Sequence, residues 1–379
     1  FLAIQTLNPA PGVYSEEGFA DVADFVTVAR RLGLRIIFSG PNTLEGVPSH
    51  RSGDTYADPA QLDACCELWR KLAERFGGEA AIMTWDLLNE PRVGWARDGG
   101  KFPDRLRLWR AYAKERLGLE VGEDFPAMDS TGQDRRIYRA YVEFIEHLAE
   151  NWVARQAEAL RSAGAKQNVT VGLVQWSAPI FLTPGTGYTG FRPRRIAPHL
   201  DYMSAHFYPI LSAPGAELEP ELSEQTAYLE VVARATRVEG KPLVMEEFGW
   251  KGGRRVPGDP KTWPEAHQSL WCERLMDVTG RVASGWLNWA WRDCDDPKTD
   301  ISAASGLWTH DGRLKHWGGR FLDFARRWGA EPPPRAPAEK RFEIDLADYL
   351  YDNGGHPPVT WLVDFATAEP GTSVEVVFA

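Results

Sequence analysis

The stretch TWDLLNEPRV, residues 84–93, joins an apolar strand pattern to an abrupt polar end. Leu87 and Leu88 suit the interior of a sheet. Asn89, Glu90 and Pro91 follow where a buried strand should stop. A carboxylate at such a place costs stability unless it is paired or used. Glu90 is therefore a candidate functional residue, and we looked for a partner at the end of another strand.

Strands and helices alternate around this stretch. The apolar patterns predict strands at 1–7, 34–40, 81–90, 169–176, 200–209, 242–250 and 285–291, with helices at 16–32, 60–76, 104–117, 135–162, 221–236, 264–280 and 319–328. Such alternation predicts parallel strands, and near-continuous apolar strands indicate a sheet buried on both faces. No G-x-G-x-x-G follows a strand, which argues against a dinucleotide fold.

Polar residues instead gather at the C-terminal ends of several strands, where a (β/α)8 TIM barrel carries its chemistry. We therefore predict an α/β chain with a (β/α)8 barrel over residues 1–329. Seven strands are one short of closure, so we expect the first strand to lie upstream of Phe1. The segment AEPPPRAP (330–337) predicts a stiff connector, and residues 330–379 then form a small C-terminal β appendage.

The composition limits the class of protein. The chain has 379 residues, of which 43% are hydrophobic and 25% charged, an ordinary globular balance. The formal net charge of -10 argues against nucleic acid or an anionic membrane as partner, and no apolar run is long enough to span a bilayer. We expect a monomer that acts on a neutral substrate.

Four cysteines, Cys65, Cys66, Cys272 and Cys294, show no C-x-x-C spacing, so neither a zinc site nor a redox dithiol is expected. A disulfide between Cys272 and Cys294 stays open, and with it the cellular compartment. The acidic cluster that begins at Asp293 does not fit an EF-hand loop. We expect no metal and no cofactor.

The partner sought for Glu90 lies in KPLVMEEFGW (241–250), where Glu246 and Glu247 end an apolar strand just before Gly249. Two carboxylates at strand ends are what cleavage of a glycosidic bond needs. One donates a proton to the leaving oxygen, and the other attacks the anomeric carbon or activates water. The alternation of side chains along a strand does not by itself choose between Glu246 and Glu247.

Aromatic residues surround the same strand ends. In AHFYP (205–209), His206 and Tyr208 are two apart and face the same side of a strand, where they can hydrogen-bond a carboxylate or a sugar hydroxyl. In NWAWRD (288–293), two indole rings share one face of the last strand. The candidates for stacking on sugar rings are Trp176, Trp250, Trp289 and Trp291.

Taken in order, WDLLNEP, HFY, EEFG and WLNWAW resemble glycoside hydrolase family 5 and its retaining (β/α)8 relatives, over about residues 1–328. The resemblance implies that Glu90 is the acid/base and Glu247 the nucleophile, since the family places Glu before an aromatic residue and Gly. It implies that Asn89 contacts the 2-hydroxyl of the sugar. His206, Tyr208 and Trp289 would complete the cleavage subsite.

The chain departs from the family in two places. The family carries an Arg on its second strand, which would here precede FLAIQTL (1–7), and a His at the end of its third strand, where this chain has FSGPN (38–42). His50 follows in the next loop. Loss of the Arg would impair catalysis if that residue keeps the nucleophile ionised.

The resemblance implies a retaining hydrolase of β-linked oligo- or polysaccharides, an endo-β-1,4-glucanase or mannanase. Exo action on short β-glycosides is an alternative, because residues 92–134 could close one end of a cleft. A catalytically impaired carbohydrate-binding barrel is a second alternative. A barrel aldolase would need a Schiff-base lysine, for which Lys251 is the nearest candidate.

Overall fold

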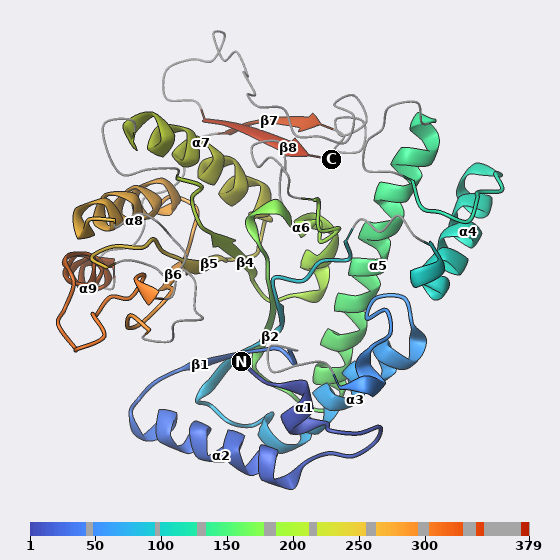
Figure 1. Cartoon of the computed structure of the whole chain (residues 1–379), viewed down its shortest axis with the longest axis horizontal. Helices are drawn as coiled ribbons and strands as arrows, with labels where there is room; N and C mark the ends of the chain where they lie inside the picture. Colours follow the sequence, from blue (N-terminus) through green and yellow to red (C-terminus); the bar gives the residue numbers. More distant parts are fainter. Residues whose placement is uncertain are drawn as a thin grey trace. The chain divides into compact units, whose positions relative to one another are not determined.

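The computed structural model describes residues 1–42, 48–94, 99–126, 134–177, 187–211, 218–254, 263–294 and 303–328, together with two strands at 339–344 and 373–378. The chain divides into two compact units. The first contains residues 1–203 and the second contains residues 204–343, and each also takes part of the remaining tail. Figure 1 shows the elements of both units.

The first unit contains a three-stranded parallel sheet in the order β1-β2-β3 (Figure 1). Its strands are β1 (Ile36–Ser39), β2 (Ile82–Asn89) and β3 (Asn168–Gly172). Its longer helices are α2 (Glu16–Arg31), α3 (Pro59–Phe76), α4 (Pro103–Leu117) and α5 (Arg135–Ser162). Short helical turns are α1 (Ile4–Leu7), α6 (Pro193–Ile196), η1 (Ser49–Arg51), η2 (Gly99–Lys101), η3 (Gln175–Ser177) and η4 (Ala197–His199).

Three of these helices begin at a side-chain cap. The first turns of α2, α3 and α5 are preceded by Ser15, Asp58 and Asp134, respectively. The side chain of each of these residues accepts a hydrogen bond from a backbone N–H of the first turn, at 2.8 to 3.0 Å. Such caps satisfy donors that have no partner within the helix. The helix starts predicted from the apolar pattern therefore coincide with local capping chemistry.

The core of the first unit is centred on Trp85 of β2, which is fully buried. Its ring stacks on Phe38 and meets Trp69 edge-on, each at 5.9 Å between centroids. The indole N–H of Trp85 donates to Gln167, and that of Trp69 donates to Gln156. Because these two buried N–H groups have partners, Trp69 and Trp85 are buried with little polar penalty.

The second unit contains a three-stranded sheet in the order β4-β5-β6, in which β5 and β6 are parallel. The strands are β4 (Met203–Phe207), β5 (Leu243–Phe248) and β6 (Gly285–Asn288), and the helices are α7 (Leu218–Thr236), α8 (Glu265–Thr279) and α9 (His316–Trp328). A two-stranded sheet is formed by β7 (Glu339–Ile344) and β8 (Ser373–Phe378). In the core, Phe207 packs on Tyr228 of α7 and on Trp271 of α8.

Two sequence expectations change. The strand predicted at 1–7 is only partly confirmed. Ala3 pairs with Asn42 in a parallel bridge, whereas residues 4–7 form the helical turn α1, in which Ile4 and Leu7 are buried at helical spacing. A short apolar run fits either period. The open question of a disulfide is answered, since no disulfide joins Cys272 and Cys294. The connector at 330–337 lies outside the described residues.

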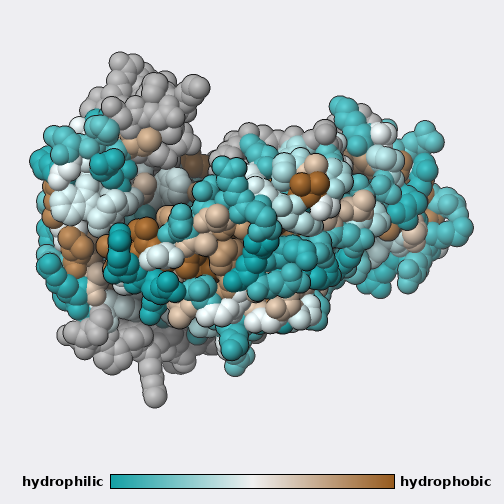
Figure 2. Space-filling model, turned by 90° about the horizontal axis from the view of Figure 1, so that it is seen from below, coloured by the Kyte–Doolittle hydropathy of each residue, from teal (hydrophilic) through white to brown (hydrophobic). Residues whose placement is uncertain are grey.

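Figure 2 shows one face of the molecule. In the view of Figure 2, hydrophilic residues cover most of the face that is seen, and apolar residues show as patches among them. Within the described segments, no helix combines the length and apolar character that a bilayer crossing requires.

Candidate active site

Glu247 lies near the end of β5, with its side chain 15% exposed. The hydroxyl of Tyr208, just beyond β4, donates to Oε2 of Glu247 at 2.9 Å. Nδ1 of His206, a buried residue of β4, lies 3.7 Å from the same oxygen. Two side chains, one on β4 and one just beyond it, thus orient this carboxylate oxygen. A carboxylate that must keep a fixed direction needs such partners.

Local geometry explains the glycine after EEF. A Cβ on Gly249 would come within 2.4 Å of the carbonyl oxygen of Trp289. Trp289 in turn donates its backbone N–H to Phe248 at 2.8 Å. Only glycine permits this approach, and the approach places Trp289 directly beside the end of the strand that carries Glu247. Glu246, by contrast, is 8% exposed, as expected for the alternate face of β5.

Three of the predicted sugar-stacking residues lie in the second unit, and they differ in accessibility. Trp289 is half-buried, and Trp291 is 67% exposed, with Trp308 tilted against it at 6.1 Å. Trp250 is only 6% exposed because it packs edge-on against Trp263, and the ammonium of Lys251 lies 5.1 Å from its ring centre. Trp250 is thus largely covered by its neighbours, and its role in stacking on sugar stays a prediction.

The segment that follows β6 is fixed by a buried ion pair. Lys315 donates to both oxygens of Asp293, at 3.1 and 3.3 Å, and to the carbonyl of Ala304 at 2.7 Å. Burial raises the pKa of Asp293 and lowers the pKa of Lys315, and the attraction between them opposes both shifts. The carboxylate of Asp293 is thus paired with Lys315 within the fold. The other acidic residues considered for a cation lie outside the described part of the chain.

Glu90, in the first unit, is half-buried at the end of β2 beside Asn89. Its φ is +48°, the one left-handed value at a non-glycine residue among those the structure describes. Its backbone N–H donates to Gly172 of β3 at 2.8 Å. Non-glycine residues adopt this conformation at an energetic cost and concentrate at functional sites.

Below Glu90, the buried carboxylate of Asp86 links all three strands of the sheet. It accepts from the Ser39 hydroxyl of β1, and its Oδ1 accepts the backbone N–H of Gly172 at 2.7 Å. The same oxygen accepts from the Leu88 N–H within β2 at 3.3 Å. These bonds fix the strand ends from which Asn89 and Glu90 project.

Trp176 lies beyond β3 in the turn η3 and is half-buried. The guanidinium of Arg92 is 5.0 Å from its ring centre. Partial burial lowers the pKa of Arg92, and the nearby carboxylate of Glu90 opposes that shift. The first unit therefore brings Asn89, Glu90, Arg92 and Trp176 to neighbouring strand ends.

Several residues near these side chains could not be identified from the sequence. Tyr56, Arg105 and Trp308 lie on loops or helices far along the chain from the residues they contact, so no spacing pattern links them. His50 lies 3.3 Å from Asn8 and its pKa is lowered by burial, but no described contact joins it to a candidate catalytic residue.

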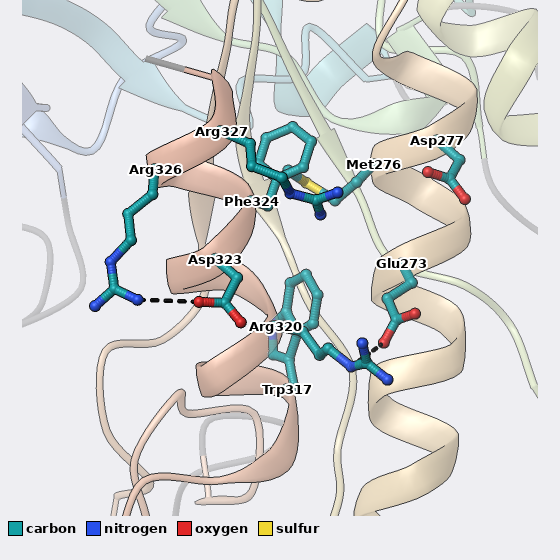
Figure 3. A pocket seen from close by; sticks show the side chains of 9 residues that line it. All are labelled: Glu273, Met276, Asp277, Trp317, Arg320, Asp323, Phe324, Arg326 and Arg327. Carbon is teal, nitrogen blue, oxygen red and sulfur yellow. Dashed lines mark hydrogen bonds and ion pairs between the residues drawn. The ribbon is translucent and has the colours of Figure 1, made fainter. Parts of the chain in front are cut away.

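A separate groove of about 480 Å³ lies between α8 and α9 (Figure 3). Trp317 and Phe324 form part of its wall. Its charges are largely paired with one another, Arg320 with Glu273 at 3.4 Å and Arg326 with Asp323 at 3.0 Å. Paired exposed charges are common on helix surfaces, so this groove shows no sign of catalytic chemistry.

Comparison with known proteins places the chain in a family. The family model Cellulase (glycosyl hydrolase family 5) matches residues 3–295. Mannan endo-1,4-beta-mannosidase 7 of Arabidopsis thaliana is 22% identical over 272 residues, which are 65% of this chain and 53% of that protein. The chain thus spans about half the length of this curated relative.

Solved structures show the same fold at low identity. A GH5_18 protein from Streptomyces cattleya, in complex with Manβ1-4GlcNAc, has a TM-score of 0.61 and 14% identity, covering 92% of this chain and 76% of its own. The exo-β-1,4-mannosidase Op5Man5 from Opitutaceae bacterium strain TAV5 has a TM-score of 0.59 and 14% identity, covering 97% and 56%. A β-galactosidase from Rahnella sp. R3 has a TM-score of 0.68 and 13% identity, covering 99% and 59%.

The family and these neighbours confirm the predicted (β/α)8 class of α/β fold, while the expected first strand and the C-terminal appendage stay predictions. The family match also argues against the aldolase hypothesis, since enzymes of this family cleave O-glycosyl bonds. On the match over residues 3–295, the chain belongs to glycosyl hydrolase family 5.

Proposed function

We propose that the chain is a retaining hydrolase of β-1,4-linked mannosides, with Glu247 as nucleophile and Glu90 as acid/base. The observation that carries the proposal is the Glu247 carboxylate, oriented by the Tyr208 hydroxyl at 2.9 Å and approached by His206 at 3.7 Å. A carboxylate that accepts a hydrogen bond is stabilised in its ionised form, which is the form that attacks.

In the first step, Glu247 attacks the anomeric carbon while Glu90 donates its proton to the departing oxygen. In the second step, Glu90 takes a proton from water, which displaces Glu247 and restores the starting configuration. Asn89 beside Glu90 would hold the sugar 2-hydroxyl. Retention requires that the two carboxyl groups lie about 5 to 5.5 Å apart in the working enzyme.

Substrate preference is inferred from the relatives. The Arabidopsis relative is named as a mannan endo-β-mannosidase, and several structural neighbours are mannosidases or complexes with a mannose-containing disaccharide. Trp176, Trp289 and Trp291 offer accessible or half-buried rings for successive sugar units. We therefore propose endo action on β-1,4-mannan or glucomannan.

Exo action on short β-mannosides is the second candidate, favoured by the named activity of Op5Man5 and by the disaccharide bound to the GH5_18 protein. The two modes differ in their products. An endo enzyme releases a ladder of oligosaccharides and quickly lowers the viscosity of a mannan solution, whereas an exo enzyme releases a single small sugar from the start.

The test is a product profile on mannan, glucomannan, cellulose and laminarin with the wild-type chain and Glu247→Gln. Mannan-derived products that vanish in the variant would support the proposal. Products from cellulose or laminarin alone would overturn the substrate assignment. Binding of mannan without turnover by the wild type would instead support the impaired, carbohydrate-binding barrel.

A further inference from the structure

The turn that follows Glu90 is held by hydrogen bonds at successive backbone groups. The N–H of Glu90 donates to Gly172 at 2.8 Å, and the N–H of Val93 donates to Thr189 at 2.9 Å. Between them, the N–H of Arg92 donates to the Tyr56 hydroxyl at 3.1 Å. Pro91 and Val93 of this turn are buried, so its backbone groups need partners within the fold, and the partners they have fix the path of the turn.

Arg105, in the first turn of α4, supplies the remaining anchors. Its Nη1 donates to the carbonyl of Val93 at 2.7 Å and reaches that of Gly94 at 3.3 Å. Its Nε and Nη2 donate to both oxygens of Asp54, at 2.7 and 3.0 Å. The Arg105 side chain is 3% exposed and that of Asp54 is 6% exposed, so the pair is shielded from water.

Asp54 and Tyr56 lie in the short connection between η1 and α3. Asp54 accepts the backbone N–H of Tyr56 at 3.1 Å, and the Tyr56 ring packs on Trp152 of α5 and on Phe191. Because the ring is embedded in the core, its hydroxyl has a fixed position. We call Asp54, Tyr56 and Arg105 the Arg105 clamp.

The clamp is more than a brace for α4. The Arg105–Asp54 pair alone would be enough to fix α4. The guanidinium also donates a hydrogen bond to the carbonyl of Val93, three residues after Glu90. Fork-like donors that bind a carboxylate and a backbone carbonyl together fix both groups in one plane. The left-handed φ of Glu90 persists only where the surroundings over-determine it, and the clamp supplies that constraint.

We infer that Asp54, Tyr56 and Arg105 are positioning residues that hold the turn at residues 90–94, so that the Glu90 carboxyl group stays aimed at the leaving-group oxygen. This inference rests on the proposed role of Glu90 as acid/base. It also assigns a role to α4, which lies within residues 92–134, the segment considered above as the closed end of a cleft.

The test compares two aryl β-mannosides that differ only in the leaving group, phenol or dinitrophenol. Dinitrophenol departs without protonation, whereas phenol needs the acid. For Arg105→Met and Tyr56→Phe we expect kcat/KM on the phenyl substrate to fall about 100-fold, the scale of a misplaced catalytic group. On the dinitrophenyl substrate, kcat/KM should stay close to the wild-type value. Any fall in kcat on that substrate should be reversed by azide, which attacks in place of the water that the acid/base activates.

Arg105→Lys keeps the charge but has a single donor nitrogen. On the phenyl substrate it should be more active than Arg105→Met and less active than wild type. Arg51→Met is the matched control. Arg51 is also buried, at 5% exposed, and donates to the carbonyl of Ala64 at 3.0 Å, but it makes no described contact with residues 90–94. It should lower the melting temperature without changing the ratio between the two substrates.

Glu90→Ala separates failure of the clamp from failure of the proposed function. If Glu90→Ala loses phenyl mannoside activity selectively and the clamp variants lose both activities equally or neither, the positioning role is wrong and the function stands. If Glu90→Ala leaves the ratio unchanged, the acid/base assignment is wrong and the inference falls with it. If Arg105→Met does not fold, the isosteric Tyr56→Phe decides.

Discussion

Replacing Tyr208 by Phe tests the orientation of the proposed nucleophile with the loss of a single oxygen atom. The 2.9 Å bond from Tyr208 to Glu247 is a hydrogen bond to a charged group, a class that contributes about 1.5–3 kcal/mol. The Glu247 side chain is only 15% exposed, so water replaces the lost donor poorly. If this energy is realised in the transition state, kcat/KM should fall about 10- to 100-fold.

The assay is the pH dependence of kcat/KM on an aryl β-mannoside. We expect the acidic limb of the profile to move to higher pH in Tyr208→Phe, since a carboxylate that loses a donor is protonated more readily. Retention of full activity with an unmoved acidic limb would refute the assignment of Glu247 as an ionised nucleophile held by Tyr208.

Tyr188→Phe provides a closely matched control for this experiment. Tyr188 donates to Glu146 at 2.8 Å, a Tyr–Glu hydrogen bond of nearly the same length at a buried position of the first unit. Glu146 keeps the charges of Arg192 and Arg195, each at 3.5 Å. We expect this variant to lose some stability and to leave the pH profile as it is, which would separate the loss of a hydrogen bond from the loss of orientation.

Three further outcomes are expected. Glu247→Gln should abolish turnover and leave the circular dichroism spectrum and melting temperature close to wild type, and residual wild-type activity would remove the mechanism. NMR of the first product should show retained configuration, and a crystal structure should show the two carboxyl groups about 5 to 5.5 Å apart, whereas inversion with a separation near 9 Å would contradict double displacement. Lys315→Met should lower the free energy of unfolding by about 3–5 kcal/mol in urea titrations, because it leaves Asp293 charged and buried, and an unchanged midpoint would show that the pair is not needed.

The positions of the two acids could be predicted because both depend on local patterns. An apolar run that ends in Asn-Glu-Pro, and another that ends before a glycine, are visible without knowledge of the fold. The structure adds observations that lie outside the pattern, since the carbonyl of Trp289 requires Gly249 and since Glu90 adopts a left-handed φ that non-glycine residues rarely adopt. Residue type and strand end were readable, but backbone strain was not.

The errors arose where tertiary contacts decide between local alternatives. Residues 1–7 suit a strand or a helical turn equally, and burial of Ile4 and Leu7 favours the turn. The sequence also gives no sign that Trp250, close to Glu247 along the chain, packs against Trp263, because that contact arises only in the fold. The contact between Asp54 and Arg105 joins residues 51 positions apart, and no periodicity in the sequence could reveal it.

Each unit places one buried ion pair behind residues of the proposed site. Arg105 and Asp54 lie behind the turn after Glu90, and Lys315 and Asp293 lie behind the segment after Trp289. Such pairs add little net stability, since desolvation offsets their attraction. Burial lowers the pKa of Lys315 in the folded chain, so proton binding favours the unfolded state. This cost is fully present below the folded pKa and fades as the pH rises from there towards the ordinary lysine value. A packed apolar pair would avoid the cost but could not hold a chosen carbonyl and carboxylate in one direction.

The common feature of the two pairs is that each also binds a loop carbonyl, that of Val93 or that of Ala304, which is what positioning a loop requires.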